Sequence, residues 1–228
     1  FDVLADFRGM IKVDKKDKTL KHFVVWIHEG KQFTQLKKKR VIKKMYQRNK
    51  KFTPFFISMH IKDIISFKNL DDIYHNVFSL NPRNKFDLGT FKGKHKFTDD
   101  QKTLLKKLKR SSLKKQYHYQ FKNPGKLYVY CNIHPEMMGV VHIFNHFYFT
   151  KPNKKGQFKL PQLPKGRWTL KIDSPFLEKV FVKKIIIDIN KKKIYKFKLK
   201  IKDEIAEKEH LRKDGTPYQP IDLDDEYY

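Results

Sequence analysis

Cysteine is scarce in this chain of 228 residues, because Cys131 is the only one. A single Cys excludes an internal disulfide, and it equally excludes haem attachment through a Cys-x-x-Cys-His motif and a binuclear copper centre bridged by two Cys. Long apolar runs are absent too, since no stretch approaches the roughly 18 consecutive apolar residues that span a bilayer. With no apolar signal region after Phe1, we expect a mature or truncated form of a soluble protein or domain.

Acidic residues and Arg are few compared with Lys. The chain has 24 Asp and Glu against 52 Lys and Arg, a formal net charge of +28, and only seven of the basic residues are Arg. Base readout and bidentate phosphate contacts favour Arg, so this composition argues against nucleic-acid binding. A solvated Lys surface explains the charge, and docking on an acidic partner or an anionic membrane surface stays open as the alternative.

The single Cys lies in the stretch YVYCNIHPEMMG at residues 128–139. Cys131, His134 and Met137 bring a thiolate, an imidazole and a thioether onto one short loop. A blue-copper centre uses these groups, with two His and one Cys in a trigonal set and a weak, long axial Met. A structural zinc site would need two further strong ligands in place of Met, which is a poor zinc donor. The loop therefore predicts a copper site whose second His comes from elsewhere in the chain.

The best candidate for the second His is His75, which follows an alternating apolar run and precedes Asn76. The pair His75-Asn76 and the loop Cys-x-x-His-x-x-Met resemble cupredoxins. The loop spacing is similar to that of amicyanin, and the surrounding residues are similar to plastocyanin-like proteins of the methylamine-utilisation type. Multicopper oxidases also resemble this pattern, but they need paired His-x-His motifs, and the sequence contains none.

This resemblance implies one type 1 copper per chain, bound by His75, Cys131 and His134 with Met137 as the axial ligand. It also implies a supporting set around the ligands. The Asn76 amide is expected to bond backbone near Asn132 and so tie the two ligand segments together. Pro135 stiffens the loop directly after His134 by removing a backbone dihedral.

The function implied by the resemblance is outer-sphere electron transfer in the periplasm or another extracytoplasmic compartment, with no substrate transformed and therefore no enzyme. The positive charge favours an acidic redox partner, such as a cytochrome or a copper enzyme. Two rivals stay open. The same ligands could store or deliver copper, or the chain could be a scaffold whose charged surface binds an acidic polymer or a membrane.

Alternation of apolar and aromatic residues with Lys predicts an all-β protein of two sandwiches. We assign residues 1–144 to a cupredoxin-like Greek-key sandwich, with residues 1–30 supplying its first two strands. Residues 145–202 form a small second sandwich that resembles transthyretin-like, carboxypeptidase-regulatory domains. Residues 203–228 are an acidic tail, which either folds back on the basic body or stays mobile.

One helix is expected inside the first sandwich. Thr98-Asp-Asp-Gln101 is typical of a capping box, and the apolar residues Leu104, Leu105 and Leu108 follow it on one side of the helix. We interpret the helix as an insertion that closes one end of the sandwich, with partner docking as the alternative.

Overall fold

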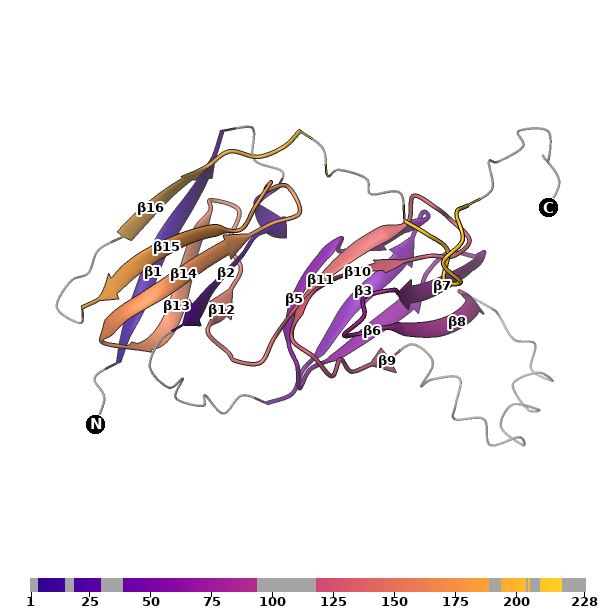
Figure 1. Ribbon diagram of the computed structural model, residues 1–228, viewed down its shortest axis with the longest axis horizontal. Coiled ribbons are helices and arrows are strands. Elements are labelled where there is room, and N and C mark those ends of the chain that lie inside the picture. The colour runs from indigo at the N-terminus through magenta and orange to yellow at the C-terminus, as the bar shows by residue number, and fades with distance from the viewer. Residues whose placement is uncertain are drawn as a thin grey trace.

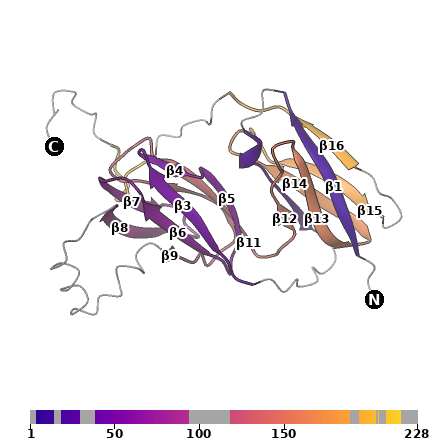
Figure 2. The same cartoon turned by 180° about the vertical axis from the view of Figure 1, so that it is seen from behind.

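The computed structural model describes residues 4–14, 19–29, 39–93, 118–188, 194–203, 205 and 210–218. In these residues the chain forms two β-sandwiches that lie side by side (Figures 1 and 2). The all-β prediction is confirmed, and the only helical element described is the 3-10 turn η1 (Leu20–His22). None of the described helical residues forms a span long and apolar enough to cross a membrane.

The first sandwich carries the predicted metal ligands and contains two sheets. The five-stranded sheet has the order β5 (Phe56–His60), β11 (Met138–Phe144), β10 (Gly125–Tyr130), β7 (Tyr74–Ser79) and β8 (Phe86–Lys92). The four-stranded sheet has the order β4 (Lys51–Thr53), β3 (Ile42–Arg48), β6 (Ile64–Asn69) and β9 (His118–Tyr119). Cys131 and Met137 belong to the buried core between these sheets, with Met45, Phe67 and Val77 among their neighbours.

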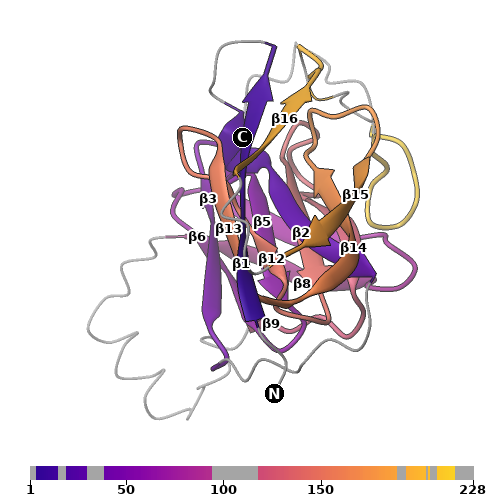
Figure 3. The ribbon, with the colours of Figure 1, turned by 90° about the vertical axis from the view of Figure 1, so that its left-hand side faces the viewer.

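The second sandwich combines strands from both ends of the chain. Its three-stranded sheet has the order β13 (Gln157–Pro164), β1 (Leu4–Val13) and β16 (Ile194–Leu199). Its four-stranded sheet has the order β12 (Phe149–Thr150), β2 (Val24–Glu29), β14 (Gly166–Asp173) and β15 (Phe181–Ile187). Figure 3 views the molecule from the side of this second sandwich.

The pairing of β1 and β2 corrects our expectation that residues 1–30 open the copper sandwich. β1 pairs antiparallel with β13 and parallel with β16, and β2 pairs with β12 and β14. Alternation predicts a strand but not its partner, which depends on side-chain fit between strands. Such fit is visible at Gly9, where a Cβ would collide with the ring of Phe158 on β13.

The strand β2 is buried on both faces. Val25 and Ile27 pack in the core of the second sandwich, whereas Val24 and Trp26 pack against the first. Successive side chains of a strand point to opposite faces, so one strand serves both. The partners on the first sandwich are Phe56, Val140 and Phe144. This apolar cluster joins the two sandwiches directly.

Three predictions about organisation are not tested by the structure. The expected helix around residues 98–108 lies outside the described residues. The domain limits at residues 144 and 202 stay predictions, as does the likeness of the second sandwich to transthyretin-like domains.

Candidate metal centre

The strand order brings the two ligand segments together. His75 is the second residue of β7, and Cys131 directly follows β10, which pairs with β7 through Tyr130 and Phe78. Residues 131–137 form the connection from β10 to β11. Two backbone bonds close this connection: the Cys131 amide donates to the Met137 carbonyl at 3.1 Å, and the Met137 amide donates to the His134 carbonyl at 3.0 Å.

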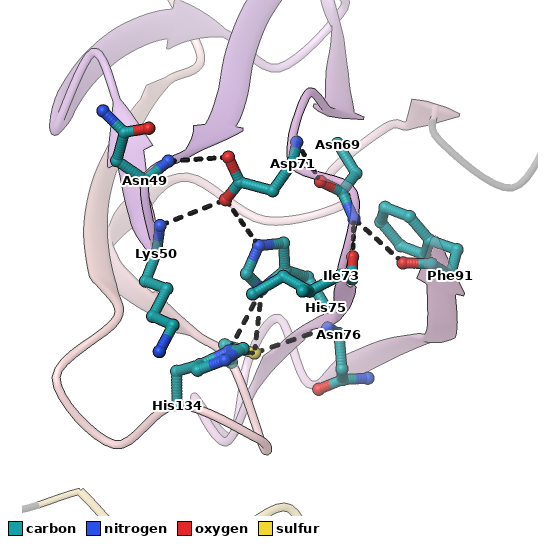
Figure 4. Close-up of polar contacts among 10 residues, drawn as sticks. Asn49, Lys50, Asn69, Asp71, Ile73, His75, Asn76, Phe91 and His134 are labelled. Carbon is teal, nitrogen blue, oxygen red and sulfur yellow. Dashed lines mark hydrogen bonds and ion pairs between the residues drawn. The ribbon is translucent and has the colours of Figure 1, made fainter. Parts of the chain in front are cut away.

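Three donor atoms converge at the centre (Figure 4). The Nδ1 atoms of His75 and His134 lie 3.1 Å apart, and the Cys131 Sγ lies 3.9 Å from the first and 3.6 Å from the second. In a triangle with these sides, the point equidistant from all three atoms lies about 2.1 Å from each. Zinc sites, taken as a guide to ions of this size, have metal–nitrogen distances of roughly 2.0–2.1 Å and metal–sulfur distances of roughly 2.3 Å. The three residues therefore fit a single metal ion.

Asp71 orients the His75 ring. Its Oδ2 atom lies 2.8 Å from His75 Nε2, and its carboxylate also accepts the backbone N–H groups of Asn49 at 2.7 Å and Lys50 at 3.1 Å (Figure 4). Burial raises the pKa of Asp71, but the bonds to His75 and the two amides outweigh it and lower this pKa. An ionised carboxylate only accepts, so His75 Nε2 carries a proton, and Nδ1 is the ring nitrogen that faces the centre.

The electrostatic environment favours a thiolate at Cys131. Burial by itself raises the pKa of this thiol, but the contact with His75 and the N–H groups of Asn76, Ile133 and His134 outweigh burial and lower it. The side chain is fully buried. The thiolate, rather than the thiol, is the form that binds a metal.

The two His differ in their access to solvent. His75 is fully buried, whereas His134 is half-buried beside Ile133, which is 45% exposed. Burial lowers the pKa of His134, and the neighbouring His75 and Lys50 lower it further, which favours the neutral imidazole that ligates metals. His134 is therefore the ligand nearer the surface.

The two adjacent Met residues lie in different surroundings. Met137 is fully buried and belongs to the same apolar cluster as Cys131. Met138 begins β11, is half-buried, and lines a cleft of about 1080 Å³ together with Pro135 and Tyr218. Met137 is thus the thioether placed on the core side of the loop.

Asn76 connects the two ligand segments. Its backbone N–H points at Cys131 Sγ at 3.4 Å, and its Oδ1 accepts the Asn132 amide at 3.3 Å. Its Nδ2 donates to Asp87 Oδ1 at 2.6 Å and to the Gly89 carbonyl at 3.1 Å. These bonds fix the amide in one orientation, with its oxygen toward the loop.

Sequence reasoning missed Asp71, and although it left open that the acidic tail folds back on the basic body, it did not place residues 210–218 at the ligand loop. An acid four residues before His75 was a usable signal for Asp71, although it needs the intervening turn to bring the two side chains together. Residues 210–218 lie against the 131–137 loop, where Tyr218 donates to the Cys131 carbonyl at 2.8 Å. Burial raises the pKa of Tyr218 to about 12, so the hydroxyl keeps its proton.

Solved structures similar to parts of this chain include cupredoxins. An oxidised methionine-to-leucine variant of amicyanin is 14% identical over 45% of this chain and 81% of its own, with a TM-score of 0.33. A Cu(I) methionine-to-alanine variant of amicyanin is 13% identical over 53% of this chain and 98% of its own, with a TM-score of 0.33. A purple cupredoxin from Nitrosopumilus maritimus is 16% identical over 45% of this chain and 99% of its own, with a TM-score of 0.32.

No protein-family model and no curated protein matches the chain. These TM-scores lie below 0.5, and the donor atoms of this chain and their spacing are what support a metal site.

Proposed function

We propose that this protein is a type 1 copper protein that transfers electrons between redox partners. The observation that carries the proposal is the convergence of His75 Nδ1, His134 Nδ1 and Cys131 Sγ within 3.9 Å of one another. Two imidazoles and one thiolate in a trigonal set are the strong donors of blue-copper sites. Met137, buried on the core side of the loop, completes the set as the weak axial donor.

The surrounding residues support redox chemistry at an unchanging site. A bound copper ion would supply the redox couple by alternating between Cu(II) and Cu(I). Asp71 and Asn76 hold His75 and the loop through bonds that do not depend on the metal. Such a stiff arrangement suits fast electron transfer, because the donors need not move when the charge changes.

His134 is the proposed exit for the electron. It is half-buried and flanked by exposed Ile133, whereas His75 is fully buried and bonded to Asp71. A partner docking at Ile133 would approach the ring of His134 directly. We propose an acidic partner, a cytochrome or a copper enzyme, because the chain carries a net charge of +28. The proposed compartment is periplasmic or extracytoplasmic, and no substrate is transformed.

An absorption spectrum of the Cu(II)-loaded protein tests this proposal. We expect an intense visible thiolate-to-copper band, which Cys131→Ser abolishes and His75→Gln removes or shifts. His60→Gln is the matched control, because His60 is also buried in the first sandwich but lies on β5 and bonds to the Lys62 amide. Copper binding with only weak ligand-field absorption would refute the type 1 assignment.

A competition experiment separates electron transfer from copper delivery. A carrier should keep copper against a chelator in both oxidation states while exchanging electrons freely. Ready transfer of Cu(I) to a chelator would favour copper delivery instead.

A further inference from the structure

Residues 210–218, here called the strap, follow β16 of the second sandwich in the sequence and lie on the metal-ligand loop of the first (Figure 1). The strap contains its own turn. In it the Gly215 amide donates to the Arg212 carbonyl at 2.8 Å, and the Arg212 amide donates to the Thr216 carbonyl at 2.8 Å. Gly215 adopts a φ of 87°, a left-handed conformation that favours glycine. Asp214 Oδ1 accepts the Thr216 amide at 3.0 Å. The strap is therefore a structured element.

The strap bonds the ligand loop at three residues. The Tyr218 hydroxyl donates to the Cys131 carbonyl at 2.8 Å, and the Lys213 amide donates to Asn132 Oδ1 at 2.8 Å. The third bond joins His210 Nε2 to the Pro135 carbonyl at 2.5 Å. Since a carbonyl only accepts, His210 must donate from Nε2. These bonds lie on both sides of His134.

Aromatic contacts add to these bonds. The His210 ring stacks on Tyr130, with centroids 4.0 Å apart and an angle of 22° between the planes. Tyr130 is the last residue of β10 and directly precedes Cys131. The Tyr218 ring packs edge-on against the His210 ring, with the ring centroids 5.1 Å apart. The strap thus also packs on the strand end that presents the thiolate.

The strap is linked to the His75 segment indirectly, through an ion pair with Asp87 on β8. Lys213 Nζ lies 3.0 Å from Asp87 Oδ2, and the other oxygen of Asp87 accepts Asn76 Nδ2 at 2.6 Å. Asn76 follows His75 and accepts the Asn132 amide. The strap therefore contacts the Cys131 segment directly and is linked to the His75 segment through Asp87.

We propose that the strap positions the metal-ligand loop before metal binds, with Tyr218 and His210 as its positioning residues. The proposal builds on the copper function, because a preformed loop matters only if the loop ligates. Within the loop itself, two backbone bonds join residues 131–137. The strap adds three bonds from outside and so removes conformations that the loop would otherwise have to give up on binding.

Amide hydrogen exchange on the metal-free protein tests the strap independently of copper. Tyr218→Phe removes one hydroxyl and should speed exchange of the Cys131 and Met137 amides about 2- to 10-fold, the usual effect of one lost hydrogen bond. Tyr195→Phe is the matched control. Its hydroxyl also donates to a backbone carbonyl, that of Ile186 at 3.3 Å, but in the second sandwich.

The loaded protein supplies a second measurement. Copper should dissociate to a chelator about 2- to 10-fold faster from Tyr218→Phe than from Tyr195→Phe. His210→Ala removes a bond and a stacked ring at once, so its effects on exchange and dissociation should be larger. If the loop amides exchange at equal rates in Tyr218→Phe, His210→Ala and the control, the positioning role of the strap is overturned, even if the visible band is normal. If the loop amides exchange faster in the variants but the Cu(II)-loaded protein shows no thiolate-to-copper band, the positioning role of the strap is retained and the copper function is overturned.

Discussion

Replacing Asp71 by Ala should weaken copper binding through His75. Asp71 accepts three bonds, but the two from Asn49 and Lys50 lie at an exposed turn where water can replace the carboxylate. The third comes from His75 Nε2, whose side chain is fully buried. An unpaired buried donor costs about 1–3 kcal/mol. Without its acceptor, the ring can instead place its proton on Nδ1, the atom that faces the metal.

Loss of such an orienting partner typically lowers metal affinity by about 10- to 100-fold, or about 1.4–2.7 kcal/mol. We expect this loss for Asp71→Ala in a Cu(I) competition titration against a chelator. Asp71→Asn should lose less, because its amide oxygen still accepts from Nε2. The matched control is Asp72→Ala, which removes the same charge from the adjacent, exposed residue. Equal affinities for Asp71→Ala and Asp72→Ala would refute the orienting role of Asp71.

Three further predictions concern the axial ligand, the partner and the pH dependence of stability. Met137→Leu should raise the reduction potential by removing a donor that favours Cu(II), while Met138→Leu should leave it nearly unchanged; voltammetry showing the reverse would reassign the ligand. Stopped-flow reduction by an acidic redox protein should slow steeply with added salt, since steering can raise association rates about 10- to 10³-fold and the Debye length is about 10 Å at 0.1 M; a salt-independent rate would contradict this. Burial lowers the pKa of His142 to about 4, because it outweighs the nearby Asp173 carboxylate, which by itself raises this pKa. The unfolded chain therefore binds more protons between about pH 6.5 and 4, so stability is lost as pH falls through this window, by up to about 3 kcal/mol. Denaturant unfolding of His142→Phe should show a flatter decline, and an unchanged slope would exclude His142 as the cause.

The meeting of the donor groups on the loop could be predicted from the sequence, because these residues are close together in the chain. Cys131, His134 and Met137 are delivered by a connection of seven residues, so local sequence nearly determines which groups meet. The donor geometry agrees with this expectation for Cys131 and His134. His75 came from a resemblance rather than from spacing, because 56 residues separate it from Cys131.

The all-β class was also readable, because a strand with one buried face leaves a period of two in the sequence. The partner of each strand was not. The first four residues of β2, Val24 to Ile27, are a continuous apolar run buried on both faces, and such a run shows no preferred side and hence no preferred sheet. Its place in the second sandwich depends on contacts with β12 and β14, which lie more than a hundred residues away in the sequence.

Apart from the bond between Asn76 and Asn132, which was expected from the resemblance, only the tertiary structure showed what holds the ligands in place. Asp71 became an orienting residue because a turn brings its carboxylate to His75, and Tyr218 because the strap lies on the ligand loop. The spacing of four residues before His75 is the one local signal for Asp71, whereas no local pattern distinguishes Tyr218 from the other tyrosines of the chain. The sequence by itself thus determined which groups can bind a metal, whereas long-range packing decided which residues orient them, because hydrogen bonds at a site depend on distance in space rather than in the chain.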